Sequence, residues 1–139
     1  MAQDIPAGFQ VAYEVKESPY GQGVFSKQFI LKGTLIWKYK RGTNVTSYRT
    51  VEEVRARLGQ LSKEEQEFFM SHVYLYDGYM NEILDDGRMW NHSETPDTGQ
   101  SMDDVQSTYA IRDIQEGEEL LDDYGVYEYP DWFVELVWT

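Results

Sequence analysis

Cysteine is absent from the 139-residue chain. Its absence excludes disulfides, thiolate nucleophiles, iron–sulfur clusters and every zinc site that uses cysteine ligands. Histidine is nearly absent as well, because His72 and His92 are the only two. Two imidazoles are too few for a zinc centre built from histidine alone. The sequence therefore predicts no bound metal.

Long hydrophobic runs are also lacking. No window approaches the roughly 18 consecutive apolar residues that a membrane-spanning helix needs. The first eight residues contain neither the basic region nor the apolar stretch of a secretory signal peptide. We therefore expect an intracellular protein that is neither inserted in a membrane nor secreted through a signal peptide.

Basic residues are scarce in one part of the chain. The formal net charge is −13, and residues 94–139 contain 13 of the 25 acidic residues but only one base, Arg112. Such a field repels phosphate backbones and attracts cationic partners, which argues against direct binding to DNA or RNA. A second interpretation stays open, in which the acidic residues form a solvated face that keeps the protein soluble.

The remaining composition is typical of a single globular domain. Hydrophobic residues make up 41% of the chain and aromatic residues 15%, values that argue against disorder. Residues 1–8 have the composition of a flexible leader. The rest contains no repeat, low-complexity tract or domain linker.

The hydrophobic pattern predicts many short strands with a small helical insert in the middle. Capping boxes that begin at Thr50 and Ser62 predict two helices, and Gly59 is placed to end the first. Pro130 can occupy the first turn of a C-terminal helix. Alternating or β-branched segments predict the strands, at residues 9–15, 24–26, 34–39, 108–111 and 119–121, with a turn at 18–23 and a hairpin of residues 72–76 and 79–84 around Asp77-Gly78.

Three separated segments carry the residues that could do chemistry. The first, Gly21-Gln22-Gly23-Val24-Phe25, lies between predicted strands, where glycine allows a tight turn or a close approach of the backbone to a ligand. The second runs from Arg88 to Ser93 and contains Asn91-His92. The third runs from Arg112 to Gly125 and ends in Asp122-Asp123-Tyr124-Gly125. Taken one at a time, a hairpin turn, an Asx-type turn and an acidic strand explain them equally well.

Taken together, in this order and spacing, the three segments resemble the SET domain, the family of S-adenosylmethionine-dependent protein lysine methyltransferases. The family pattern is Gly-x-Gly-Val-Phe, then Arg-Phe-x-Asn-His-Ser-x-x-Pro-Asn, then Arg-Asp-Ile-x-x-Gly-Glu-Glu-Leu-x-x-Asp-Tyr. The chain looks most like small stand-alone microbial or viral members, which would place it in the cytoplasm or nucleus, or inside a host cell.

The resemblance implies an α+β, mostly β fold of small twisted sheets over residues 9–125. In that fold, the segment of Asn91, His92 and Ser93 packs with the Tyr124 segment as a pseudoknot. Residues 126–139 would form an aromatic flank that covers the site as a lid.

The resemblance also implies roles for individual residues. Tyr124 matches the catalytic tyrosine, whose hydroxyl lies beside the transferring methyl group. The S-adenosylmethionine pocket would contain Gly21, Gln22, Gly23, Tyr74, Arg88, Asn91, His92 and Trp132, and the channel for the substrate lysine would contain Tyr109, Asp122 and Tyr127.

Three positions depart from the family. Lys38 stands where the family commonly has Glu before Tyr39. Asp122 stands where many members have Phe or Tyr, which leaves open how many methyl groups are added. Asp97 stands where the family has Asn. The cysteine-rich zinc segment that closes many SET channels cannot exist in this chain.

The function implied is therefore that of a protein lysine N-methyltransferase that uses S-adenosylmethionine. Its substrate would be a Lys/Arg-rich segment, as in histone tails or ribosomal proteins, attracted by the acidic last third. Two alternatives stay open. One is a degenerate SET domain that binds cofactor or peptide without turnover, and the other is an acidic interaction module for basic partners. Nothing in the sequence indicates the oligomeric state.

Overall fold

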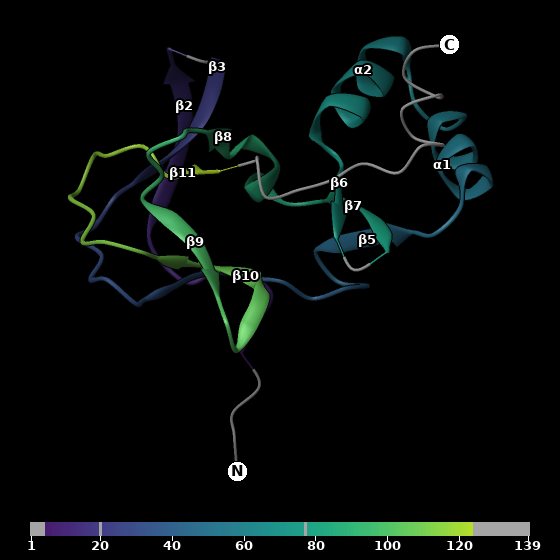
Figure 1. Cartoon of the computed structure of the whole chain (residues 1–139). Coiled ribbons are helices and arrows are strands. Elements are labelled where there is room, and N and C mark those ends of the chain that lie inside the picture. Colours follow the sequence, from purple (N-terminus) through teal and green to yellow (C-terminus); the bar gives the residue numbers. More distant parts are fainter. Residues whose placement is uncertain (1–4, 20, 77, 124–139) are drawn as a thin grey trace.

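The computed structural model describes residues 5–19, 21–76 and 78–123, and within them strands predominate over helices. The expected α+β, mostly β class is therefore confirmed. In chain order the elements are β1 (Gly8–Phe9), β2 (Tyr13–Ser18), β3 (Gly21–Ser26), β4 (Leu35–Lys38), β5 (Val45–Tyr48), α1 (Val51–Leu58), α2 (Lys63–His72), β6 (Tyr74–Tyr76), β7 (Tyr79–Ile83), the 3-10 helix η1 (Asp86–Met89), β8 (Asn91–His92), β9 (Thr98–Ser101), β10 (Asp104–Ala110) and β11 (Leu121–Asp122) (Figure 1).

The strands form small sheets rather than one large one. Their orders are β1-β4-β10-β9, β2-β3, β5-β7-β6 and β8-β11. Figure 1 shows α1 and α2 beside the β5-β7-β6 sheet on one side of the molecule, with the other sheets on the opposite side. Each side has its own core of buried side chains: Val24, Ile30, Ile36, Trp37, Val45, Trp90, Ala110, Ile114 and Leu120 in one, and Tyr48, Val54, Phe69, Val73 and Met80 in the other.

Both predicted helices are present, with the predicted caps. The Thr50 side chain accepts the backbone N–H of Glu53, and Ser62 and Glu65 form a complete capping box. Gly59 follows α1 as its C-cap. These local signals determine the helix ends because each one satisfies backbone groups that the helix itself leaves unpaired.

Several strand predictions are wrong in detail. The strand expected at residues 119–121 lies instead at Leu121–Asp122. Residues 9–15 do not form one strand. β1 ends at Phe9 and β2 begins at Tyr13, and between them the Gln10 side chain donates to the carbonyls of Pro6 and Gly8. The turn predicted through residue 23 is shorter, since Gly21, Gln22 and Gly23 pair with β2 inside β3. Within this stretch, Gly21 has a positive φ of 98°.

The segment around Asn91 packs against the segment that leads to Tyr124, as the resemblance implied. β8 and β11 pair in parallel, with Asn91 opposite Leu121 and His92 opposite Asp122. The N–H of Ser93 continues the pairing by donating to the carbonyl of Asp122 at 2.9 Å. Parallel pairing of two such short strands requires that side chains from elsewhere support it.

Asp97 supplies that support from a buried position. Its side chain is only 1% exposed, and its Oδ1 accepts the N–H of Leu121 at 2.7 Å. Its Oδ2 has no hydrogen-bond partner among the described residues, and the Nη2 of Arg112 is 3.8 Å away. Burial raises the pKa of Asp97 from 3.8 to about 6, against the opposing effects of the Leu121 hydrogen bond and Arg112.

We expect Asp97→Asn to remove a pH dependence from the stability. Because the pKa of Asp97 is raised in the folded protein, the folded state binds this proton more tightly, and the contribution of Asp97 to stability falls as the pH rises through about 6. Relative to the wild type, the free energy of unfolding of the variant should gain about 1.4 kcal/mol between roughly pH 5 and pH 7.5. Urea denaturation followed by circular dichroism measures this difference. If the difference in free energy of unfolding between variant and wild type does not change with pH, Asp97 does not have a raised pKa in the folded protein.

Three expectations concern residues outside those described. The C-terminal helix, the lid of residues 126–139 and the first half of the leader (residues 1–4) lie there, and the domain boundaries at residues 8/9 and 125/126 stay predictions. Among the helices of the described ranges, none has the length and apolar character to cross a membrane.

Candidate functional site

Asn91 connects the three motifs. Its Nδ2 donates to the backbone carbonyl of Gln22 at 3.0 Å and to Oε2 of Glu119 at 2.7 Å. Gln22 belongs to the first motif, Asn91 to the second and Glu119 to the third. A further bond of 3.2 Å from the same atom to the Oγ of Ser18 fixes the β2-β3 hairpin against this junction.

Gly23 is the position at which the motifs approach one another most closely. A Cβ atom on Gly23 would lie 3.0 Å from Nδ2 of Asn91 and would overlap the carboxylate of Glu119. No larger residue fits unless one of these side chains moves. The sequence left a tight turn and a close approach to a ligand open for this glycine, and the structure shows a close approach of the Asn91 and Glu119 side chains.

Two pockets lie side by side near this junction, between α2, η1 and the strands. The smaller encloses about 70 Å³ and the larger about 370 Å³. Together they reach the lower range of small-molecule sites. The residues common to both are His72, Val73, Ile83 and Arg88.

The structure brings part of the predicted site to these pockets. Tyr74, Arg88 and Asp122 line the smaller pocket, and Arg88 also lines the larger one. The predicted residues Gly21, Gln22, Gly23 and Asn91 gather instead at the motif junction. His92 is also outside both linings, and its Nδ1 is 3.7 Å from Oδ1 of Asp123.

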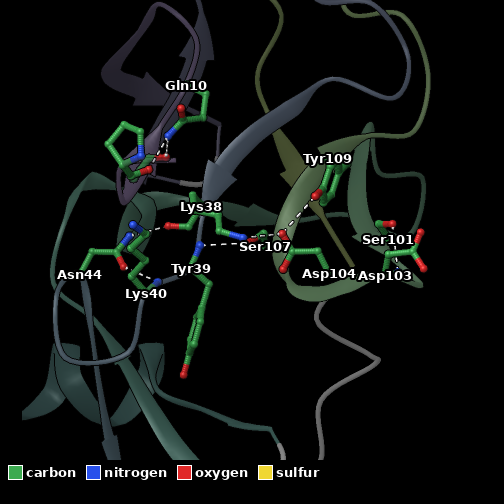
Figure 2. Close-up of polar contacts among 12 residues, drawn as sticks. Gln10, Lys38, Tyr39, Lys40, Asn44, Ser101, Asp103, Asp104, Ser107 and Tyr109 are labelled. Atoms are coloured by element: carbon green, nitrogen blue, oxygen red, sulfur yellow. Dashed lines mark hydrogen bonds and ion pairs between the residues drawn. The ribbon is translucent and has the colours of Figure 1, made fainter. Parts of the chain in front are cut away.

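Tyr109, predicted for the lysine channel, lines neither pocket. It follows Thr108, which does line the smaller pocket, on β10, and the pairing with β4 shifts register between these two residues. Figure 2 shows Tyr109 and Lys38 directed at the same carboxylate: both donate to Oδ2 of Asp104, at 3.0 Å and 2.9 Å. Tyr124, Tyr127 and Trp132 lie outside the described residues.

Among the pocket residues that sequence reasoning missed are Trp90 and Gln106 of the smaller pocket. Trp90 Nε1 and Gln106 Oε1 are buried and have no hydrogen-bond partner in the described part of the chain. A buried polar atom without a partner costs stability, typically about 1–3 kcal/mol. The polar alternation of Gln106 and Thr108 along one strand was the signal available for one of them.

The unpaired Trp90 N–H and Gln106 oxygen test whether the pocket suits the implied cofactor, S-adenosylmethionine. S-adenosylmethionine presents both hydrogen-bond acceptors and donors, which an unpaired indole N–H and an unpaired amide oxygen can satisfy. The residues present therefore fit this cofactor.

The electrostatics of the pocket keep its tyrosine protonated. Burial, followed by the neighbouring Tyr39 and Asp122, raises the pKa of Tyr74, whereas Arg41 lowers it. Burial lowers the pKa of His72, whose Nδ1 is 2.8 Å from the carbonyl oxygen of Phe68. At neutral pH the pocket thus contains a phenol and a neutral imidazole.

The described residues contain no cluster of three His, Asp or Glu side chains able to hold a metal ion.

The comparisons with known proteins agree on one family. The model of the SET domain matches residues 21–125. A search of curated proteins finds no match. Among solved structures, a candidate histone methyltransferase of Plasmodium falciparum is similar to this chain, with 20% identity and a TM-score of 0.53, over 89% of this chain and 99% of that chain.

Two further structures are similar over smaller parts of their own length. The methyltransferase domain of human histone-lysine N-methyltransferase SETMAR has 23% identity and a TM-score of 0.57, over 84% of this chain and 45% of that chain. A chain of ctPRC2, in an autoinhibited conformation bound to S-adenosylmethionine, has 21% identity and a TM-score of 0.62, over 95% of this chain and 17% of that chain. At these identities the likeness shows a shared fold.

Proposed function

The chain belongs to the SET-domain family, and from this we propose that it is a protein lysine N-methyltransferase that uses S-adenosylmethionine. The observation that carries the proposal is that Asn91, a residue of the second motif, bonds to a residue of each of the other two motifs. One side-chain amide joins the Gly-x-Gly strand, the Asn-His strand and the acidic third motif. If each motif formed only its own local turn or strand, the three motifs would not need to contact one another.

The cofactor would be held by residues of the motif junction and of the adjoining pockets. We assign Gly21, Gln22, Gly23 and Asn91 to its amino-acid part on the family pattern, with His92, Tyr74 and Arg88 beside them. Trp90 and Gln106 add an unpaired donor and acceptor. When bound, S-adenosylmethionine supplies a methyl group on a positively charged sulfur.

The substrate lysine must lose its proton, because only a neutral amine can attack. The pKa of a free lysine is about 10.4, and burial away from water lowers it. Asp122 attracts the ammonium form to the smaller pocket, and the desolvation indicated by the raised pKa of Tyr74 then favours the neutral amine. Alignment of that amine with the methyl group provides much of the catalysis in a displacement reaction.

The proposed substrate is a Lys/Arg-rich protein segment, and the site of action is the interior of a cell. The support for the substrate is electrostatic, since residues 94–139 have 13 acidic residues and one base. Such a field raises the encounter rate with cations and repels nucleic acid.

Calorimetry and mass spectrometry separate this proposal from its two rivals. The full chain is titrated with S-adenosylmethionine, then incubated with a mixture of basic proteins and isotopically labelled cofactor. Saturable binding with label on lysine supports the methyltransferase. Binding without transfer indicates a degenerate SET domain, and the absence of both indicates an acidic interaction module.

We expect the substrate KM to rise with salt concentration while the cofactor Kd changes little. Salt screens exposed charges, with a screening length of about 10 Å at 0.1 M. The exposed residues Asp103 and Glu116 suit the test better than Asp104, which Lys38 and Tyr109 already engage. Asp103→Asn with Glu116→Gln should raise KM severalfold and leave kcat unchanged, the pattern of lost uniform binding.

A matched control neutralises two exposed glutamates outside the acidic third. Glu52→Gln with Glu67→Gln removes the same charge from α1 and α2. Steering by the last third predicts a smaller change in KM for this pair. Equal changes in the two double variants would show that only the net charge matters.

A further inference from the structure

A compact group of basic residues lies in this otherwise acidic chain. Residues 38–49 contain four of the 12 Lys and Arg residues and no Asp or Glu. Two of them, Arg41 before β5 and Arg49 after it, are exposed and lie against the ring of Tyr79. Their Cζ atoms are 4.1 Å and 5.4 Å from the ring centroid.

Arg41 is held in place by hydrogen bonds that lead to a buried residue. Its Nε donates to the Oη of Tyr39 at 3.1 Å and to the Oγ of Ser47 at 3.0 Å. Both hydroxyls donate in turn to Oδ1 of Asn81, at 3.1 Å and 2.7 Å. Asn81 is completely buried, so the Arg41 side chain is anchored to the core and not merely extended into solvent.

The loop that carries Arg41 is fixed as well. The buried Asn44 accepts the backbone N–H of Lys40 at 2.9 Å and donates to the carbonyl of Lys38 at 3.0 Å, as Figure 2 shows. A ligand that binds Arg41 therefore has to order little of the protein, which favours affinity.

Neither guanidinium has an acidic partner within the described residues. No carboxylate there lies within 4.0 Å of Arg41 or Arg49, whereas Arg57 binds both carboxylate oxygens of Glu82 at 3.0 Å. Two cations on one ring repel each other. An anion bound between them would remove that repulsion, and guanidinium groups bind planar or tetrahedral oxyanions through paired hydrogen bonds.

This pair lies next to the pocket assigned to the substrate lysine. Arg41 and Tyr39 both act electrostatically on Tyr74, which lines that pocket with Asp122. The Nδ2 of Asn81 also donates to the carbonyl of Tyr79 at 3.0 Å, and Asn81 pairs with Tyr74 across β6 and β7.

We propose that Arg41 and Arg49 form a binding site for one anionic side chain, a phosphate or a carboxylate, of the protein substrate close to its target lysine. The inference rests on the proposed function, since that function identifies the neighbouring pocket. It adds a specificity that net charge does not predict: the substrate segment is basic overall but has one negative group near the lysine.

Binding of a peptide set to the full chain tests the site without requiring turnover. The probes are fluorescent peptides of one lysine-centred sequence, with Ser, phosphoserine, Glu or Gln placed in turn at each flanking position. At one position we expect phosphoserine to bind about tenfold more tightly than Ser, with Glu between them, because charge-assisted hydrogen bonds are the strong ones. Fluorescence anisotropy measures the Kd.

Three arginine variants identify the site. Arg41→Gln and Arg49→Gln should each abolish the preference for phosphoserine and leave the Kd of the Ser peptide within about twofold. Arg55→Gln is the matched control, since Arg55 is exposed on α1 away from Tyr79. Arg49 makes no hydrogen bond to the described residues, so its variant stays informative even if Arg41→Gln perturbs the fold.

The outcomes distinguish this site from the proposed function. Equal binding of all four peptides at every position, or equal losses in the three variants, would overturn the anion site. Methyl transfer is then measured on the same peptides. If the peptides show an anion preference in binding but no methyl transfer, the anion site is supported and the methyltransferase function is contradicted. If they show methyl transfer but no anion preference, the function is supported and the anion site is contradicted.

Discussion

Replacement of Gly23 by valine is expected to lower the affinity for S-adenosylmethionine by at least about a hundredfold, the loss expected from breaking charge-assisted hydrogen bonds. The added atoms would occupy the space of the Glu119 carboxylate and press on Nδ2 of Asn91. Asn91 would then lose its bonds to Glu119 and to the Gln22 carbonyl. The three motifs would no longer be held in one arrangement.

A graded series makes the reason testable. Alanine adds only the Cβ, and the neighbours it meets are ends of flexible side chains. Gly23→Ala should therefore have a smaller effect than Gly23→Val. Isothermal titration calorimetry measures the affinity, and circular dichroism shows whether the fold persists.

Gly59→Ala is the matched control for a glycine substitution. Gly59 has a helical φ of −63° and only ordinary van der Waals distances to its neighbours. Alanine there should leave cofactor affinity unchanged and stabilise the protein by about 0.4–1 kcal/mol. If Gly23→Val bound the cofactor as well as Gly59→Ala, the junction at Asn91 would have no part in the site.

The helical insert was predictable from the sequence because its signals are local. The caps at Thr50 and Ser62 act within one helical turn, and a capping box before an apolar run is typical of a helix start. The hairpin around Asp77-Gly78 was predictable for the same reason. Its strands appear as β6 and β7, although His72 ends α2 and does not begin the strand.

The short strands were harder to predict because their pairing comes from distant residues. β9 has the sequence Thr-Gly-Gln-Ser, which has no hydrophobic alternation, and it forms by pairing with β10. β8 and β11 are two residues each, and Asp97 and Thr98 fix them by binding the N–H and the carbonyl of Leu121. No window of sequence contains such contacts.

Some residues of the candidate site could likewise be predicted from the sequence, and others could not. The family pattern identified Asn91 and Gly23, and the structure adds that Glu119 joins them. Trp90 and Gln106 could not be found from the pattern, because what marks them is an unpaired buried atom. The anchoring of Arg41 depends on Asn81, forty residues away in the sequence, and is visible only once β5 and β7 are paired.

Tyr124→Phe is expected to reduce kcat by at least about a hundredfold and to change cofactor affinity only a few-fold, as for the loss of one oriented polar group at a reacting centre. The assignment rests on the third motif, since Tyr124 lies just beyond β11. Asp122 is held by the pairing of β11 with β8, which continues through the bond from the N–H of Ser93 to the carbonyl of Asp122. Asp122, two residues before Tyr124 in the sequence, lines the smaller pocket.

Tyr109→Phe is the matched control, because it removes a different tyrosine hydroxyl from the one on Tyr124. The family resemblance places Tyr109 in the lysine channel, whereas its hydroxyl donates to Asp104 and its side chain lines neither pocket. We expect this variant to keep kcat within about threefold of the wild type, because it removes only a partly exposed hydrogen bond. Rates are measured with isotopically labelled cofactor on one basic substrate, with calorimetry for cofactor affinity. If both variants are equally slow, Tyr109 belongs to the lysine channel as the family resemblance implies. If Tyr124→Phe is fully active, the alignment of the third motif is wrong.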